Sequence, residues 1–536
     1  MVVRSVIVSG LLRYRRMPRR SAEQHRRRSE PLQGQRGHDE PGENETENLH
    51  VRSNGSPDDE ASPCGKVKPP MKRRTLLAAT AAVPITACAG QWTPAGVRRF
   101  TLAAEPGSAL IAPGKAPVPA WTYGGTVPGP ELRVRQGERV RVEVSNKLAQ
   151  PTTVHWHGVR VPNAMDGVPH LTQAPIAPGG TFTYDFDALD AGTFWYHSHF
   201  QSAEQLDRGL QGVLIVEERN PPQVHRDLTW VLDDWRITAA GLVSETFGNA
   251  HDMSHAGRIG NVLTVNGSSN DKFAVRAGER IRLRLVNTAN ARIFALRFTG
   301  HRPLVIAIDG HPVAPHEPAD DRVVVAPGMR CDLIVDAVGR PGDVHPVQDL
   351  FYERQRFVLM DLVYGAEPPL RDGLPPIAGL IPNPLAEPDL ARATKHEVRF
   401  EGGMMGTLHE ALLDGRRVDM RGLLRQGKAW AVNGSVASGH HVHHPMLNLE
   451  RGRSYVLQLR NRTRWHHPIH LHGHTFRVVA RNGVPTGRRE WQDTVLMSPN
   501  EDVDVAFVAD NPGDWMFHCH ILEHQDGGMM AVVRVG

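Results

Sequence analysis

Cysteine and aromatic residues are scarce in this chain: four of its 536 residues are cysteines and 6% are aromatic. So few cysteines exclude a framework that is held together by disulfides. No apolar run reaches the roughly 20 residues that a membrane-spanning helix needs. Helical periodicity is also rare, whereas Gly and Pro are abundant. The length suits two to four domains with buried cores, and the pattern favours β-structure.

The N-terminal region is basic and polar. Residues 21–70 are rich in Pro, Gly, Glu and Ser and have almost no aromatic residues, which predicts disorder. One stretch collects the arginines Arg13, Arg15, Arg16, Arg19, Arg20, Arg26, Arg27 and Arg28. A nucleic-acid-binding arm is one reading of this stretch. We favour another, in which residues 1–70 are a disordered or misassigned extension and nucleic acid is not a partner.

Residues 71–96 have the layout of an export signal. Met71 begins a short basic segment that an Ala-rich apolar stretch follows, and Arg73 and Arg74 resemble the pair of a twin-arginine signal. Because such a signal has to be N-terminal, Met71 is an alternative start of the protein. The sequence therefore predicts a protein of the periplasm or cell envelope that is exported by the twin-arginine route.

The end of this signal contains Cys88. The run Ile-Thr-Ala-Cys88 resembles a lipobox, in which the cysteine would be acylated after cleavage. Ordinary cleavage near Ala89 is the alternative, so a lipid anchor at Cys88 stays open.

Three later segments follow one pattern, at residues 134–146, 275–287 and 449–461. In each, Asn lies nine residues after Gly, apolar and polar residues alternate between them, and a Pro-marked turn with another alternating strand comes later. Such alternation predicts β-strands, and its repetition predicts three related sandwiches in an all-β fold. The expected divisions are domains at 97–220, 221–368 and 395–536, with a Pro-rich linker at 369–394.

Four His-x-His pairs stand out beside this repeat. They are His155 and His157, His197 and His199, His470 and His472, and His518 and His520. In a β-strand, alternate side chains point to the same side, so each pair presents two imidazoles together. With 29 histidines in the chain, roughly one or two such pairs are expected by chance, so a single pair is a weak signal.

The position of the pairs within the repeat is the stronger signal. His155 and His470 each lie nine residues after a repeat Asn, whereas Leu296 stands there in the second unit. His197 and His518 each lie five residues after a glycine. We therefore expect one metal site of eight histidines, shared by the first and third units, with the second unit as a spacer. Buried core histidines are the alternative, but each would need hydrogen-bond partners.

The third unit also has residues that the first lacks. It has His467, Cys519, His524 and Met529 where the first has Thr152, Ser198, Ala203 and Arg208. Two His, one Cys and a longer Met contact are the ligand set of a blue-copper centre. Cys519 lies between two histidines of the other site, so this strand can join two metal centres. Cys331 reads as a small buried residue, with a disulfide to Cys519 as the alternative.

These motifs resemble those of the multicopper oxidases, of the three-domain, laccase-like bacterial kind, over about residues 97–536. The resemblance implies three cupredoxin domains, four copper ions and coupling of one-electron oxidations to reduction of O₂ to water. It implies a type 1 copper at His467, Cys519, His524 and Met529, a type 2 copper at His155 and His470, and two type 3 coppers, one at His157, His197 and His520 and one at His199, His472 and His518.

In the family this resembles, an acid that relays protons lies shortly after the first histidine motif, and Asp166 stands at that position. The alternative is that Asp166 is an ordinary turn residue. Relatives with a second acid carry it after the last type 1 His. Here that position is Gln525, so either Glu523 or Asp526 substitutes for it or the second relay is absent.

The electron donor is the least constrained prediction. Phenols and aromatic amines are favoured, and Cu(I) is the nearest rival. The candidate Cu(I)-binding residues are Met404, Met405, the His251-x-Met253-x-His255 motif and the tract of His440, His441, His443 and His444. The alternatives are ordinary loop or core methionines and a solvated His-rich loop. A copper-binding or structural cupredoxin protein without oxidase activity is the alternative of another class. We expect a monomer.

Overall fold

The computed structural model describes residues 96–536, apart from 270–271, 371–375 and 439–443. The predicted extension, the export segment with Cys88, and His440, His441 and His443 lie outside the described residues. Strands dominate the described part and pair into six sheets, two for each third of it. The predicted all-β fold of three consecutive cupredoxin-like sandwiches is confirmed.

The first domain pairs the sheets β2-β1-β4-β6 and β3-β8-β7-β5. Apolar and polar residues alternate along β4, so one face of the strand lies in the core. Val140, Val142 and Val144 are fully buried, and the polar residues between them are partly exposed. The elements are β1 (Val97–Ala109), β2 (Val118–Tyr123), β3 (Leu132–Arg135), β4 (Arg139–Asn146), β5 (His155–His157), the 3₁₀ turn η1 (Asn163–Met165), β6 (Thr181–Asp187), β7 (Gly192–His197), α1 (Ser202–Asp207) and β8 (Gln211–Glu217).

The second domain pairs the sheets β10-β9-β12-β17-β14-β15 and β11-β19-β18-β13-β16. Its repeat strand β12 is buried along its whole length. The elements are β9 (Arg226–Trp235), α2 (Ala250–Ser254), β10 (Val262–Val265), β11 (Lys272–Val275), β12 (Arg280–Asn287), β13 (Phe294–Phe298), β14 (Leu304–Ile308), β15 (His311–His316), η2 (Ala319–Asp321), β16 (Val323–Val325), β17 (Arg330–Asp336), β18 (Val344–Asp349) and β19 (Phe357–Tyr364).

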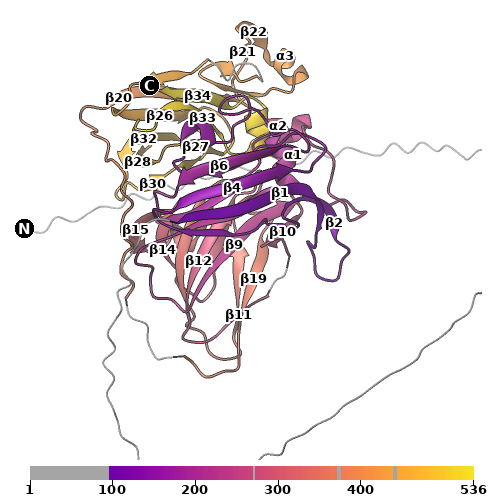
Figure 1. Ribbon diagram of the computed structural model, residues 1–536, viewed down its shortest axis with the longest axis vertical. Coiled ribbons are helices and arrows are strands. Elements are labelled where there is room, and N and C mark those ends of the chain that lie inside the picture. Colours follow the sequence, from indigo (N-terminus) through magenta and orange to yellow (C-terminus); the bar gives the residue numbers. More distant parts are fainter. Residues whose placement is uncertain (1–95, 270–271, 371–375, 439–443) are drawn as a thin grey trace, which may run out of the picture. The chain divides into compact units, whose positions relative to one another are not determined.

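The third domain pairs a long sheet built around β20-β26-β32-β28 with the sheet β25-β34-β33-β27-β31. Figure 1 shows it, in orange to yellow, beside the indigo and purple first domain. The elements are β20 (Thr394–Gly402), β21 (Glu410–Leu413), β22 (Arg416–Asp419), α3 (Met420–Arg425), β23 (Trp430–Val432), β24 (Ser435–Val436), β25 (Leu447–Leu449), β26 (Ser454–Asn461), β27 (His467–Leu471), β28 (Phe476–Arg481), β29 (Val484–Pro485), β30 (Trp491–Gln492), β31 (Thr494–Met497), β32 (Asp502–Val508), β33 (Gly513–Cys519), α4 (Leu522–Asp526) and β34 (Met530–Val535).

The asparagine that ends each repeat has the same role in all three domains. Asn146, Asn287 and Asn461 are fully buried. Each side-chain amide donates to two backbone carbonyls, and each side-chain oxygen accepts the N–H two residues on. Because a buried amide without partners would destabilise the fold, this arrangement explains why the repeat keeps Asn at that place.

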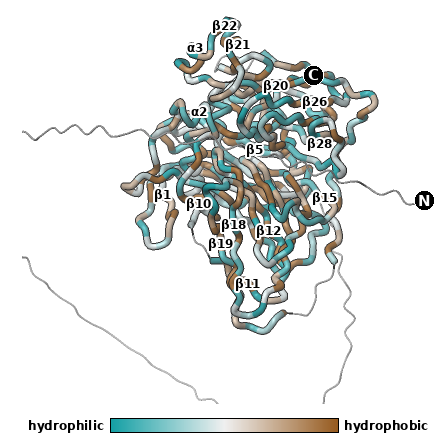
Figure 2. The backbone as a smooth tube through the Cα atoms, turned by 180° about the vertical axis from the view of Figure 1, so that it is seen from behind, coloured by the Kyte–Doolittle hydropathy of each residue, from teal (hydrophilic) through white to brown (hydrophobic). Residues whose placement is uncertain are grey.

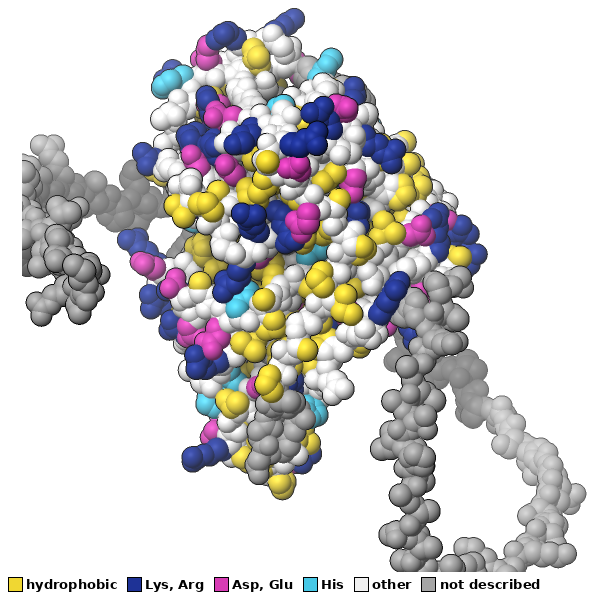
Figure 3. All heavy atoms as spheres, turned by 90° about the vertical axis from the view of Figure 1, so that its left-hand side faces the viewer, with side chains coloured by type: hydrophobic (Ala, Val, Ile, Leu, Met, Phe, Trp, Pro, Cys, Tyr) yellow, Lys and Arg dark blue, Asp and Glu magenta, His cyan; other side chains and the backbone are white. Residues whose placement is uncertain are grey.

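Figure 2 shows apolar and polar residues in bands along the strands, as the sequence alternation predicts. On the face that Figure 3 presents, basic and acidic side chains are intermixed, with small groups of hydrophobic side chains between them. Among the described residues, no helix has the length and apolar character to cross a membrane. Cys331 and Cys519 are both free and buried. The disulfide considered between them is therefore excluded.

Candidate metal centres

The eight paired histidines meet between the first and third domains. Within each domain the two pairs lie on adjacent antiparallel strands, with His155 opposite His197 and His470 opposite His518. The domains then interleave. The ring of His155 stacks on that of His472 at 3.8 Å between centroids, and the rings of His157 and His470 stack at the same distance. The structure thus brings the eight predicted histidines together in one place.

Most of these imidazoles have a buried ring nitrogen that no described residue hydrogen-bonds. They are Nε2 of His155, His197, His199 and His470, Nδ1 of His157, and both nitrogens of His520. The Nε2 atoms of the other two, His472 and His518, face each other at 3.1 Å. Leaving so many polar atoms unpaired costs free energy, so the interpretation as ordinary core histidines fails. The donor set fits metal ions instead.

Burial also sets the charge of these rings. It lowers the pKa of seven of the eight, namely His157, His197, His199, His470, His472, His518 and His520. Neutral imidazole is the form that ligates metal, so the site keeps its donors ready at ordinary pH. In each of three candidate ligand triads, the ligand atoms lie within 4.8 Å of one another. The triads are His199, His472 and His518; His155, His157 and His197; and His155, His470 and His472.

A second, smaller set lies on the other side of β33. The Sγ atom of Cys519 is 3.4 Å from Nδ1 of His467 and 3.7 Å from Nδ1 of His524. The two Nδ1 atoms are 3.1 Å apart. Burial raises the pKa of the Cys519 thiol, so binding of a soft metal has to displace its proton. Met529 is fully buried beside them, and its backbone bonds both Cys519 and His524.

The other ring nitrogen of each smaller-set histidine is fixed by a hydrogen bond. His524 Nε2 donates to the carbonyl of His255 at 2.7 Å. His467 Nε2 lies 2.8 Å from the hydroxyl of Thr463. Such contacts leave the Nδ1 lone pairs directed at Cys519, as a metal site needs. The two sets are joined through the backbone, because His518 and His520 flank Cys519.

Two acids occupy equivalent places beside the eight histidines. The backbone carbonyl of Asp166 accepts from Nδ1 of His155, and that of Asp493 accepts from Nδ1 of His470, each at 2.8 Å. Their carboxylates cross to the other domain. Asp166 accepts from Nδ1 of His472 at 2.9 Å, and Asp493 lies 3.1 Å from Nε2 of His157. The pseudo-symmetry of the repeat therefore extends to these carboxylates.

The surroundings of the two acids differ. The Oδ1 atom of Asp166 lies 3.2 Å from Nδ1 of His155 but forms no hydrogen bond with a described residue. Asp493 is held by Arg330, whose guanidinium donates to both carboxylate oxygens at 2.8 and 2.5 Å. Burial alone would raise the pKa of Asp493, but Arg330 and the neighbouring histidines hold it well below the usual value. Asp493 is thus a fixed anion.

Arg330 comes from the second domain, at the start of β17. It is fully buried and also contacts Asp309 and the carbonyl of Thr193. The second domain contributes no histidine to the cluster, as predicted. Its description as a spacer was nevertheless incomplete, because Arg330 reaches the acid that orients His157 and His470.

Replacing Arg330 by Gln is expected to lower the free energy of unfolding by about 3–5 kcal/mol, because it leaves the buried Asp493 without its cation. Denaturant unfolding of the copper-free and copper-loaded proteins would measure this. Arg302→Gln is the matched control, since Arg302 forms an exposed pair with Glu317 and should tolerate the change. An equal stability of the two variants would contradict a structural role for the Arg330 pair.

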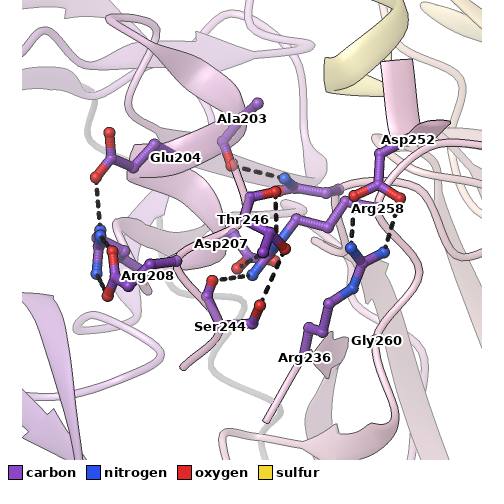
Figure 4. Close-up of polar contacts among 12 residues, drawn as sticks. Ala203, Glu204, Asp207, Arg208, Arg236, Ser244, Thr246, Asp252, Arg258 and Gly260 are labelled. Carbon is purple, nitrogen blue, oxygen red and sulfur yellow. Dashed lines mark hydrogen bonds and ion pairs between the residues drawn. The ribbon is translucent and has the colours of Figure 1, made fainter. Parts of the chain in front are cut away.

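Ion pairs fix the segment that presents the His255 carbonyl to His524 (Figure 4). Both carboxylate oxygens of Asp252, in α2, accept from Arg236. The buried Arg258 donates to Asp207 of α1 at 3.0 Å and to the carbonyl of Ser244 at 2.6 Å. The Asp207 contact ties the segment to the first domain, and the other two tie it to the rest of the second domain, which helps to position the carbonyl that accepts from His524.

The remaining candidate residues are spread around the smaller set. Glu523 is buried and accepts from the backbone of Arg258 and the side chain of Asn290. Gln525 is buried against Ser202, and Asp526 lies at the surface. Met253 packs into the third-domain core, whereas Met404 and Met405 are exposed.

Several contributing residues were missed from the sequence, namely Asp493, Thr494, Arg330, Asp309, Thr463 and the carbonyl of His255. Thr463 lies only four residues before His467, but no pattern marked it as its partner. The other contacts join positions far apart in the chain, as Thr494 does with His157 at 3.0 Å, or use backbone atoms. The repeat could have revealed Asp493 as the counterpart of Asp166. The different spacing hides this, because Asp166 follows His155 by 11 residues whereas Asp493 follows His470 by 23.

Comparisons with known proteins agree with this geometry. Three family signatures, each described as multicopper oxidase, match residues 108–221, 226–347 and 419–536. The multicopper oxidase MmcO of Mycobacterium tuberculosis is 32% identical over 474 residues, which cover 81% of this chain and 87% of that protein. Laccase-1 of Botryotinia fuckeliana is 30% identical, covering 77% of each chain.

Solved structures agree as well. The crystal structure of a multicopper oxidase from Pseudomonas thermotolerans is 37% identical with a TM-score of 0.73, and the match covers 82% of this chain and all of that one. The first and third domains bring eight histidines together beside the set centred on Cys519, and the relatives match across most of their length. The chain therefore belongs to the multicopper oxidase family.

Proposed function

We propose that this protein oxidises phenolic and other aromatic donors one electron at a time and passes the electrons to O₂, which is reduced to water. The observation that carries the proposal is the pairing of two donor sets on one strand. Cys519 faces the smaller set, and its neighbours His518 and His520 face the cluster of eight histidines. A copper-storage protein or a structural cupredoxin would have no use for such a bridge.

The donor atoms suit four copper ions. Thiolate and imidazole favour copper at the smaller set, and neutral imidazoles favour it at the larger. We assign a type 1 copper to His467, Cys519, His524 and Met529, a type 2 copper to His155 and His470, and type 3 coppers to His157, His197 and His520 and to His199, His472 and His518. Copper bound there supplies one-electron oxidation at the first site and multi-electron reduction of O₂ at the others.

The residues of the chain supply the path for electrons and protons. The backbone from Cys519 to His518 and His520 is the shortest covalent connection between the two sets. Asp166 is the proton relay in our proposal, because it bonds His472 yet keeps one buried oxygen unpaired. Asp493 orients His157 and His470 and stays ionised.

A cuprous oxidase is the second candidate. The exposed thioethers of Met404 and Met405 favour this function. They lie close to the smaller set, because the carbonyl of Met404 accepts a hydrogen bond from the ring of Trp465, two residues before His467. The rings of His251 and His255 also stack at 4.2 Å beside Trp465. Soft thioether and imidazole donors would suit Cu(I).

Oxygen uptake by the copper-loaded protein would separate these functions. With a phenol as the donor, we expect catalytic uptake with one O₂ consumed for each four donor molecules. Faster uptake with Cu(I) than with any phenol would favour the cuprous oxidase. A fully copper-loaded protein that consumes no O₂ with either donor would refute the oxidase.

We further propose export to the periplasm or cell envelope by the twin-arginine route. Replacing both Arg73 and Arg74 by Lys should keep the protein in the cytoplasm, because that route reads the paired arginines. Cell fractionation with immunoblotting would measure this. Replacement of Lys68 and Lys72 by Arg is the control, and normal export of the Arg73 and Arg74 variant would exclude the route.

A further inference from the structure

A hollow of about 600 Å³ opens beside the smaller donor set, between the second and third domains. On one side it is lined by Trp465 and His466, which directly precede His467. On the other it is lined by Ile521 and by Ala256, which follows His255. The carbonyl of His255 accepts from His524. His467 and His524 are themselves fully buried, so a molecule in the hollow would contact the residues that adjoin them in the chain or hold them in place.

The walls of the hollow are aromatic. Phe351 meets the ring of His466 edge to face at 5.2 Å and the ring of Tyr352 at 4.9 Å. Tyr352 is held in place, because its hydroxyl accepts from the backbone of Ile293 and its ring lies 5.4 Å from the guanidinium of Arg292. Flat, fixed rings of this kind favour a planar aromatic ligand.

The charges around the hollow are mostly positive. Arg354 and Arg464 line it and are exposed, with Glu353 as the only lining acid. Neither arginine side chain forms a hydrogen bond or ion pair within the described part of the chain. A smaller hollow of about 270 Å³ shares Phe351 and Glu353 and adds three more arginines, Arg297, Arg322 and Arg356. Of these, Arg297 pairs with Asp321. The face thus offers guanidinium groups without counter-ions.

We propose that this hollow binds an anionic aromatic donor, a phenol that carries a carboxylate. The ring lies against Phe351 and His466, and the carboxylate pairs with Arg354 and Arg464, whose planar groups suit it. This inference rests on the proposed oxidase function and specifies its substrate. The same arginines would repel Cu(I), so the hollow is a poor entry for a cuprous ion.

The reaction balances without another reactant. Each phenol loses its hydroxyl proton and one electron and leaves as a phenoxyl radical. Four phenols give the four electrons and four protons that convert one O₂ into two waters. The carboxylate is unchanged, so it serves only for binding.

A matched pair of donors tests the inference: sinapate and its methyl ester, which share the phenol and differ in the charge. For the wild-type protein we expect kcat/KM for O₂ uptake to be roughly three- to tenfold higher with sinapate, the range expected for partly exposed charge pairs. The preference should shrink as salt is raised, because exposed charges are screened.

The double variant Arg354→Gln and Arg464→Gln should lose this preference, chiefly through a higher KM for sinapate. Arg302→Gln, on an exposed arginine outside the hollow, is the control. Binding supplies a readout apart from turnover: 3,4,5-trimethoxycinnamate, which has no phenolic hydrogen, should bind the wild-type protein several-fold more tightly than the double variant by calorimetry.

The outcomes distinguish the two levels of the proposal. If both donors are oxidised with equal kcat/KM, or if the double variant keeps the preference for sinapate, the anionic-donor inference is wrong and the oxidase stands. If the copper-loaded protein oxidises neither donor, the proposed function itself fails. Tighter binding by the wild type together with a charge preference that the variant loses supports both.

Discussion

Cys519→Ser is expected to remove the blue colour of the protein and to lower O₂ uptake with phenols by roughly three orders of magnitude or more, as the loss of an indispensable group does. The hydroxyl of Ser is a hard, weak donor, whereas Cu at the smaller set needs thiolate. His518 in β33 and His520 directly after it keep their places, so the eight-histidine cluster should still bind metal. Copper analysis should therefore give about three ions per chain in the variant instead of four.

Cys331→Ser is the matched control for this prediction. Cys331 is the other cysteine of the described part, and it is buried in the second-domain core away from every donor atom discussed. It should cost some stability but leave colour, copper content and turnover unchanged. If Cys519→Ser were to consume O₂ with a phenol at the wild-type rate, electrons would have to enter by another path.

The sequence was sufficient to predict the fold and the meeting of the paired histidines for a physical reason. A period of two residues is the signature of a strand, and it also places His155 and His157 on one side of that strand. The repeat then relates strands that are far apart in the chain. Its geometry requires both domains to present equivalent pairs, and the structure brings the pairs together as expected.

The residues that support the donors could not be predicted in the same way. Arg330 and Asp493 are 163 residues apart, and nothing local marks either as a partner of the other. The His255 carbonyl is a backbone atom, which no residue type reveals. Asp166 follows β5 after a short connection, whereas β28, β29 and β30 lie between β27 and Asp493, so the place of Asp493 does not follow from that of Asp166. Only the folded chain brings these groups to the histidines.

The difference between these two acids determines what each can do. Both carboxylates approach a histidine of the other domain, Asp166 with His472 and Asp493 with His157. Arg330 neutralises Asp493 and occupies both of its oxygens. A carboxylate held in this way cannot accept a proton without breaking a buried ion pair, which is costly. Among the described residues, no Lys or Arg contacts Asp166, and its Oδ1 atom forms no hydrogen bond, so it is the acid that can carry protons.

Asp166→Asn is accordingly expected to slow turnover with phenols about 10²- to 10⁴-fold, the usual contribution of a positioned proton carrier. The Asn oxygen can still accept from His472, so copper content and blue colour should be kept. In stopped-flow measurements, bleaching of the colour by a phenol without O₂ should be as fast as in the wild type, and recovery on adding O₂ should be slow.

Asp493→Asn is the control, because it should weaken folding and copper retention through the loss of the Arg330 pair. Once it is loaded, it should reoxidise faster than Asp166→Asn. Equal recovery rates for wild type and Asp166→Asn would show that protons reach O₂ by another group. Glu523 is then the next to test, since it is the other buried acid near β33 and its side chain already contacts Asn290 and the backbone of Arg258.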